Sequence, residues 1–210
     1  MLEYVANNWL EILGLASGLA CVWLLIRENY LTFPIGLIYA VVTVVVVVQA
    51  NLYADVVLNL YYVAMNAYGW YFWLSGGGSR RMSSSTIKEH PASEQLPVAT
   101  ISWQLWLSLL VLLALGTWTM GWYFETYTEA DLPYPDSFTT VASFIAMWMS
   151  ARKYLESWLW WFVIDVIQIG LYLMKGIEEY AILYTVYLVM AVMGWRAWSQ
   201  SQAAKTAQVA

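Results

Sequence analysis

The sequence has little charge and almost no cysteine or histidine. Only 11% of its 210 residues are charged, whereas soluble domains average about 25%. This low charge excludes a disordered chain, a coiled coil and an ordinary water-soluble enzyme. The net charge of −5, without a basic stripe, excludes a nucleic-acid partner. The single Cys21 excludes an intramolecular disulfide or a thiolate metal cage, and the single His90 excludes HExxH-type zinc chemistry.

Long apolar runs are what the sequence does contain. Hydrophobic residues make up 61% of the chain and aromatic residues 17%. A helix that crosses a bilayer needs about 20 mostly apolar residues, and seven runs fit. They are residues 8–26, 31–49, 52–74, 102–124, 138–151, 157–175 and 179–198, the short fifth run being expected to extend at both ends. The runs are too continuous for barrel strands, so we predict an all-α polytopic membrane protein with seven transmembrane helices.

Basic residues are distributed unevenly among the predicted connections. Eight of the nine Lys and Arg residues fall on one side of the membrane, and only Lys175 falls on the other. Because basic loops stay in the cytoplasm, we expect the N-terminus outside and the C-terminus inside. The acidic loop 125–137 then lies outside. The N-terminal region has no basic start typical of a signal peptide, so the first span is expected to remain in the mature protein.

Two of the predicted spans share a sequence pattern. Residues 62–73 read YxxMxxxGWxxW, and residues 187–198 repeat this pattern 125 positions later. Two shorter matches occur at displacements of 124 and 127, which would require a small gap: Tyr30-Leu31 with Tyr154-Leu155, and Tyr53-Ala54 with Tyr180-Ala181. Chance similarity in an aromatic-rich chain is the alternative. A true repeat predicts two parallel triplets around a connector, as in transporters that hold a solute near the midplane between their halves.

The domain organisation that follows is a 3+1+3 arrangement. In chain order it comprises a first triplet (1–74), a flexible cytoplasmic loop (75–101), a linker helix (102–124), an acidic external loop (125–137), a second triplet (138–198) and a cytoplasmic tail (199–210). The loop 75–101 is rich in glycine and serine, which favours flexibility.

Polar side chains inside spans are costly and are therefore candidates for function. Three spans carry such residues at helical spacing, so that each set forms one stripe along its helix. The stripes are Trp158, Trp161, Asp165, Gln168 and Tyr172; Asp55, Asn59, Tyr62 and Asn66; and Tyr180, Tyr184 and Tyr187. We predict a solute site formed by Trp158, Trp161, Asp165, Gln168, Asn59, Tyr62, Asn66, Tyr184 and Tyr187.

These side chains suggest the chemistry of the solute. Indole faces stack on flat rings and attract cations, and amides and phenols bind hydroxyl and carboxamide groups. The carboxyl of Asp165 favours a positive charge or takes up a proton. We therefore expect a small, flat, cationic or polar aromatic solute, without a metal or cofactor. Packing is the alternative for several of these residues, and four tryptophans are predicted to anchor the membrane interface: Trp70, Trp73, Trp195 and Trp198.

Several sequence features together resemble the Pnu vitamin transporters, within that family the PnuC-type nicotinamide riboside transporters. These features are the NLYAD stretch at residues 51–55, the Tyr/Gly/Trp ends of the third and seventh spans, Trp158-x-x-Trp161, and the LYLMKG sequence at residues 171–176. The resemblance covers residues 8–198. It implies a fold similar to the sugar-transporting SWEET proteins, often trimeric, in the bacterial inner membrane. It also implies facilitated diffusion of a vitamin precursor, trapped by a cytoplasmic kinase, on a site that includes Trp158 and Trp161.

One residue departs from the pattern of the resembled family. Nicotinamide riboside carriers are expected to have an amide residue four positions after the second tryptophan, where this chain has Asp165. Nicotinamide riboside and thiamine both carry a permanent ring cation, and an aspartate suits either solute. Thiamine or another vitamin therefore remains the alternative solute, and proton coupling through Asp165 remains an alternative mechanism.

Two other functional classes fit the sequence less well. A retinal-binding sensor needs a lysine in its last span, and residues 179–198 contain none. An intramembrane protease could use Asp55 and Asp165 as a dyad, but the sequence has no Gly-x-Gly-Asp motif and the two residues differ in predicted depth. We accordingly expect a transporter rather than an enzyme, without catalytic residues.

Overall fold

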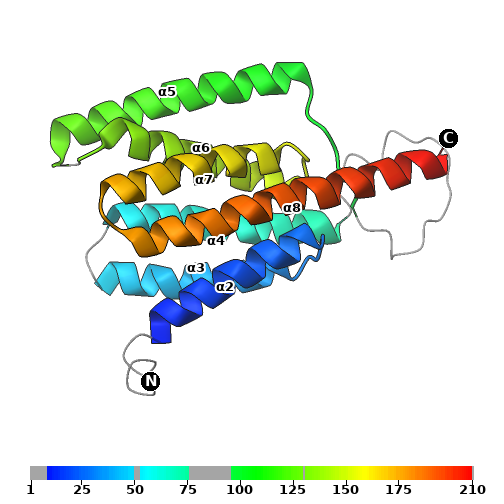
Figure 1. Cartoon of the computed structure of the whole chain (residues 1–210), viewed down its shortest axis with the longest axis horizontal. Helices are drawn as coiled ribbons and strands as arrows, with labels where there is room; N and C mark the ends of the chain where they lie inside the picture. Colours follow the sequence, from blue (N-terminus) through cyan, green and yellow to red (C-terminus); the bar gives the residue numbers. More distant parts are fainter. Residues whose placement is uncertain (1–8, 50–52, 76–95, 130, 210) are drawn as a thin grey trace. The chain divides into compact units, whose positions relative to one another are not determined.

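The computed structural model describes residues 9–49, 53–75, 96–129 and 131–209 (Figure 1). Within these residues the chain forms seven α-helices, and its one β-contact is an isolated bridge. The helices are α2 (Trp9–Ile26), α3 (Thr32–Gln49), α4 (Tyr53–Leu74), α5 (Trp103–Tyr127), α6 (Pro133–Ala151), α7 (Ser157–Met174) and α8 (Glu178–Val209). The prediction of an all-α chain with seven helices is therefore confirmed for the described residues.

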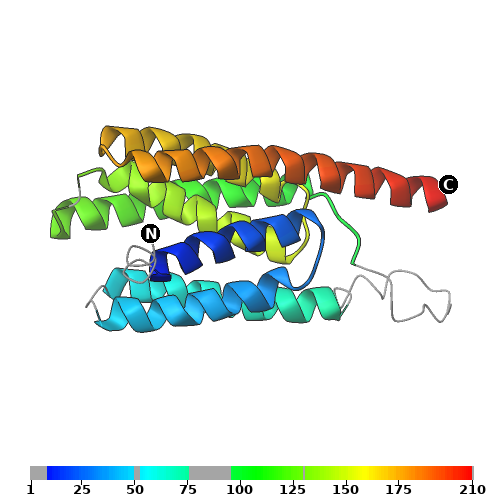
Figure 2. The ribbon, with the colours of Figure 1, turned by 60° about the horizontal axis from the view of Figure 1, so that its bottom comes forward.

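Most helix boundaries lie within one residue of the predicted spans, and the exceptions have local causes. α6 extends beyond the predicted run 138–151 at its N-terminal end only, where a proline occupies the first turn. Proline is tolerated there because the first N–H groups of a helix have no intrahelical partner. α8 continues through residues 199–209, which were expected to form a tail (Figure 2). This segment is rich in alanine and glutamine and contains neither glycine nor proline, a composition that favours helix.

Three helices are long and apolar enough to cross a membrane by length and composition among the described residues. They are α5, α7 and most of α8. Shorter apolar stretches lie in α2 (Leu13–Ile26) and α3 (Thr32–Val41). The predicted loop 75–101 lies largely outside the described residues.

The chain divides into two compact units, Met1–Leu96 and Pro97–Ala210. In the first unit α2 packs on α3, and α3 packs on α4. In the second unit α5 packs on α6, α6 on α7, and α7 on α8. A buried core of the second unit joins α5, α6 and α7 through Leu109, Val141, Ala142, Ile145, Ala146, Met149, Tyr154, Trp160 and Ile164.

The turn after α2 and the turn after α6 have the same backbone structure. Glu28 and Lys153 adopt a left-handed conformation, with φ of 54° and 58°. Five backbone hydrogen bonds recur 125 residues apart, from Arg27, Glu28, Asn29, Thr32 and Phe33 in the first turn and from Arg152, Lys153, Tyr154, Ser157 and Trp158 in the second. In both turns an arginine lies over a tryptophan four residues before it, Arg27 over Trp23 at 5.0 Å and Arg152 over Trp148 at 5.9 Å.

A packing motif between two successive helices, α3 and α4 in the first unit and α7 and α8 in the second, also recurs at this displacement. In the first unit, Phe33 of α3 lies against Gly69 of α4 and edge-to-face on Trp73, with ring centroids 5.0 Å apart. In the second unit, Trp158 of α7 lies against Gly194 of α8 and edge-to-face on Trp198, at 5.4 Å. Glycine is required at both positions because a Cβ there would overlap the aromatic ring.

These recurrences correct two expectations. The equivalent hydrogen bonds of the two turns make Leu155, 125 residues later, the counterpart of Tyr30. The sequence match of Tyr30 with Tyr154, at 124 residues, is therefore not the structural alignment of the two turns. Gly69 of α4 and Gly194 of α8 contact equivalent residues at the same displacement of 125, so the expected gap is not needed. Trp73 and Trp198 are 7% and 0% exposed, and they are core residues of the repeated motif rather than exposed interface anchors.

Candidate functional site

The polar stripe of α7 faces the interior of its unit. Trp158 and Asp165 are 2% and 4% exposed, while the opposite face of the helix is apolar and exposed. That exposed face comprises Leu159, Phe162, Val163 and Val166. The prediction that this stripe faces inward is therefore confirmed for Trp158 and Asp165, whereas Trp161, Gln168 and Tyr172 are half-buried.

The two tryptophans of the stripe have different neighbours. Trp158 packs against Gly194 and Trp198 of α8. Trp161 approaches α6, where its indole N–H donates a hydrogen bond to Ser150 Oγ at 3.1 Å. Trp161 also packs against the buried core of the second unit. Both rings are thus held in place by neighbouring helices.

Trp158 differs from its counterpart Phe33 by an indole N–H group. Within the described residues this N–H has no hydrogen-bond partner, although the ring is almost fully buried. Phe33 makes the same contacts with a glycine and a tryptophan and has no polar atom. The packing therefore requires an aromatic ring, and the buried N–H of Trp158 stays unpaired among the described residues, which costs about 1–3 kcal/mol.

Asp165 is the most unusual residue of the stripe. Its carboxyl makes no hydrogen bond or ion pair within the part of the chain that the structure describes, although the residue is buried. The equivalent residue of α3, 125 positions earlier, is Ala40, which is also buried at 2% exposure. Helix packing at this position is therefore satisfied by a methyl group, and the carboxyl is an addition that packing does not explain.

Tyrosines from α7 and α8 stack on one another beyond Asp165. The ring of Tyr172 lies between the rings of Tyr180 and Tyr184, at centroid distances of 5.0 and 5.3 Å and interplanar angles of 19° and 23°. Tyr187 contacts Tyr184 edge-to-face at 5.9 Å. The structure thus brings the predicted residues Tyr184 and Tyr187 together. Gln168, one helical turn before Tyr172, is half-buried.

The remaining predicted residues lie on α4 in the first unit. Asn59 and Asn66 are buried, at 8% and 7% exposure. The Nδ2 of Asn66 donates to the carbonyl of Tyr62 at 2.8 Å, and its side chain lies against Gly36 of α3. Asn66 therefore fills a notch between α3 and α4, which favours the packing alternative for this residue. The side chain of Asp55 lies outside the described residues.

Six of the nine predicted residues thus lie in the second unit and three in the first. Sequence reasoning left the stacked rings of Tyr172 and Tyr180 out of the proposed set, although their helical spacing was visible. It also missed Gly36 of α3, which leaves room for the side chain of Asn66. Among the described residues, no group of three His, Cys, Asp or Glu side chains is placed to hold a metal.

Comparison with known proteins gives consistent results. The model of the nicotinamide mononucleotide transporter family matches residues 8–200. The chain is 29% identical to the nicotinamide riboside transporter PnuC of Escherichia coli, over 92% of this chain and 86% of that protein. It is 23% identical to the riboflavin/roseoflavin transporter RibM of Streptomyces davaonensis, over 90% and 84%. The crystal structure of the vitamin B3 transporter PnuC superposes with a TM-score of 0.70 and 22% identity, covering 95% of this chain and 84% of that one.

Proposed function

Because this chain belongs to the nicotinamide mononucleotide transporter family, we propose that it takes up a vitamin precursor across the bacterial inner membrane, most specifically nicotinamide riboside. The curated relatives are named as transporters, and the fold is that of a solved vitamin B3 transporter. Apolar helices of membrane-spanning length agree with this function. The protein is a carrier and not an enzyme.

The observation that supports a cationic solute is the buried, unpaired carboxyl of Asp165. A permanently charged pyridinium ring would supply the positive partner that the described residues do not. The free indole N–H of Trp158 supplies a donor on the same face of α7. In this proposal Trp161, Gln168, Tyr184 and Tyr187 complete the site within the second unit, and Asn59, Tyr62 and Asn66 of the first unit stay predictions from the sequence.

The proposed mechanism is facilitated diffusion with alternating access. In this mechanism α2–α4 and α6–α8 are two parallel triplets and α5 is the additional helix of a 3+1+3 arrangement. The recurrence of a turn and a packing motif at a displacement of 125 residues supports the repeat. Phosphorylation of the solute by a cytoplasmic kinase would keep its internal concentration low and maintain net uptake. We retain the expected orientation, N-terminus outside, and the trimeric assembly as parts of this proposal.

Thiamine is the second candidate solute, because it also carries a permanent ring cation that Asp165 could pair with. Riboflavin, the solute in the name of one relative, has an uncharged ring system and gives the carboxyl no partner. A proton-coupled mechanism would use the same residue as a proton site. These alternatives differ in their measurable consequences.

Uptake into liposomes distinguishes them. Purified protein should equilibrate radiolabelled nicotinamide riboside across the membrane faster than protein-free liposomes do, without accumulation above the external concentration. Accumulation that disappears when a proton gradient is collapsed would indicate proton coupling instead. Uptake of thiamine alone would identify the alternative solute, and uptake of neither would refute the proposed function.

A further inference from the structure

α5 is attached to the second unit at many points, although the sequence predicts a connector between two triplets. From these attachments we propose that α5 is a fixed part of a four-helix body, α5–α8, which moves as one piece during transport. This inference rests on the proposed alternating-access function. It concerns which helices move together, which the family assignment and the fold leave open.

The segment before α5 is clamped to the turn between α6 and α7. Ala99 forms a parallel bridge with Tyr154, in which Ala99 N donates to Lys153 O at 3.0 Å and Leu155 N donates to Ala99 O at 2.8 Å. Ile101 N donates to both carboxylate oxygens of Glu156, at 3.2 and 3.3 Å. Hydrogen bonds to a charged acceptor are stronger than those between neutral groups, so this clamp is a substantial attachment.

The middle of α5 lies close to α6 through two glycines. Gly116 lies against Val141, and Gly121 lies against the ring of Tyr134. Small residues allow two helix backbones to approach closely, which increases dispersion contacts and makes sliding between the helices costly. Trp106 of α5 also stacks on Trp160 of α7, with centroids 5.8 Å apart and planes at 17°.

The opposite end of α5 has its own attachment to α6. Tyr134 donates a hydrogen bond from its phenol to Glu125 at 3.0 Å. α5 is therefore attached to the turn after α6 at one end, to α6 and α7 along its length, and to α6 at the other end. A helix that served only as a flexible connector would not need attachments at both ends and along its middle.

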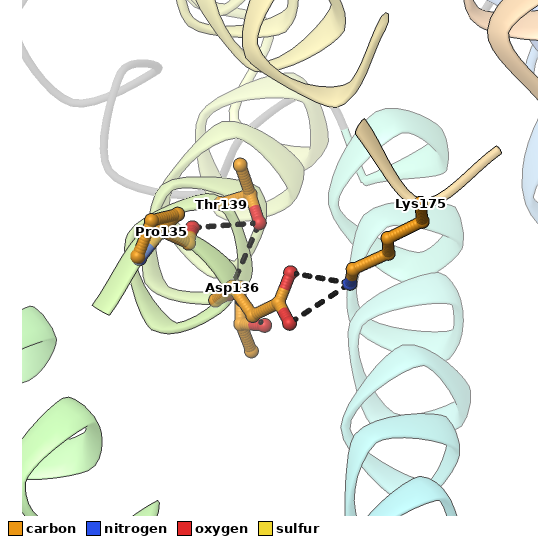
Figure 3. A network of polar contacts seen from close by, with 5 residues as sticks. Pro135, Asp136, Thr139 and Lys175 are labelled. Carbon is orange, nitrogen blue, oxygen red and sulfur yellow. Dashed lines mark hydrogen bonds and ion pairs between the residues drawn. The ribbon is translucent and has the colours of Figure 1, made fainter. Parts of the chain in front are cut away.

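The other helix pairs of this unit are also joined at both ends. α6 and α7 are joined at one end by Trp161 and Ser150, and at the other by the ion pair of Lys175 with Asp136, at 3.0 and 3.1 Å (Figure 3). α7 and α8 are joined by the motif of Trp158, Gly194 and Trp198 at one end and by the stacked tyrosines at the other. The buried core that joins α5, α6 and α7, together with the aromatic contacts between α7 and α8, resists sliding and splaying and makes the four helices one body.

A disulfide between α5 and α6 tests the proposal directly. A disulfide requires Cβ atoms about 3.8 Å apart. A Cβ on Gly116 would lie 3.7 Å from the Cβ of Val141. The G116C/V141C variant would also carry Cys21→Ala, which removes the native cysteine. Alanine should be tolerated there because Ala146, the residue 125 positions later, is fully buried.

Nicotinamide riboside uptake would be compared in the oxidised and reduced forms of this variant, with the two single-cysteine variants as controls. The proposal predicts that oxidation changes the uptake rate by less than about twofold, because the crosslink joins helices that do not move apart. A loss of more than about tenfold that a reductant reverses would overturn it. If even the native protein takes up no vitamin precursor, the proposed function fails, and the distance measurement described next still decides on the four-helix body.

A distance measurement covers the case in which the double variant folds poorly. Spin labels would be placed at the exposed positions Leu112 of α5 and Val166 of α7. One narrow distance distribution by pulsed electron paramagnetic resonance, the same with and without solute, supports one body. A second distance population, or a shift on adding solute, refutes it.

Discussion

Glu28 and Lys153 occupy the same place in two copies of one turn, 125 residues apart, and both have a left-handed backbone. Their side chains carry opposite charges, so the feature that the two turns share is the backbone conformation. A non-glycine residue in this conformation costs roughly 1–2 kcal/mol, and a β-branched residue costs more. The hydrogen bonds around each turn hold the residue there despite this cost.

This relationship predicts the same order of stability at both positions. Glu28→Val should lower the unfolding temperature more than Glu28→Gly, because valine disfavours positive φ and glycine adopts it freely. Lys153→Val and Lys153→Gly should follow the same order. Thermal unfolding in detergent measures this. A glycine variant less stable than the valine variant at either position would contradict a role for the backbone conformation.

Trp158→Phe should separate the packing role of this residue from its polar role. Phe33 already makes the equivalent contacts with Gly69 and Trp73, so the phenylalanine variant should be nearly as stable as the native protein. Trp158→Ala should be less stable by about 3–5 kcal/mol, as for other large buried aromatic residues. Binding of nicotinamide riboside to the phenylalanine variant should weaken several-fold. An unchanged affinity would assign Trp158 to packing alone.

Asp165→Ala should leave the protein as stable as before or make it more stable. The variant reproduces Ala40 of α3 and removes a buried carboxyl that has no partner among the described residues. Thermal unfolding of the solute-free protein checks this, with Asp165→Asn as the isosteric control. A strong loss of stability in the alanine variant would show that the carboxyl has a structural role.

The ion pair between Lys175 and Asp136 should contribute little to stability. The side chains are 31% and 41% exposed, so water screens their attraction. A double-mutant cycle with Lys175→Met and Asp136→Asn should give a coupling energy of less than about 1 kcal/mol. A coupling energy above about 1 kcal/mol would instead show that this ion pair is itself a main attachment of the four-helix body.

The helices were predictable because lipid leaves the backbone few alternatives, so each long apolar run had to be a helix. The extension of α8 was missed because residues 199–209 are polar, and an apolar-run criterion does not detect a polar helix. The burial of Trp73 and Trp198 was also missed. A tryptophan near the end of a span is commonly an interface anchor, and only the glycine and aromatic ring opposite each one show that it packs in a core.

Part of the candidate site could also be predicted from the sequence. Spacing placed the stripe of α7 on the inward face, because a helix fixes which residues share a face. It could not show that Trp158 contacts α8 whereas Trp161 contacts α6, since that depends on how the helices pack around α7. Spacing also could not show that Asn66 fills the notch at Gly36, because this notch is formed with the neighbouring helix α3.

Equilibrium binding of two solutes of similar shape and different charge tests the central claim most directly. The purified protein and Asp165→Ala would be titrated calorimetrically with nicotinamide riboside and with its uncharged dihydropyridine form. We expect the native protein to prefer the charged form at least tenfold, about 1.4 kcal/mol, and the variant to lose this preference. Equal affinity of the native protein for both forms, or the same preference in the variant, would contradict a site built around the carboxyl of Asp165.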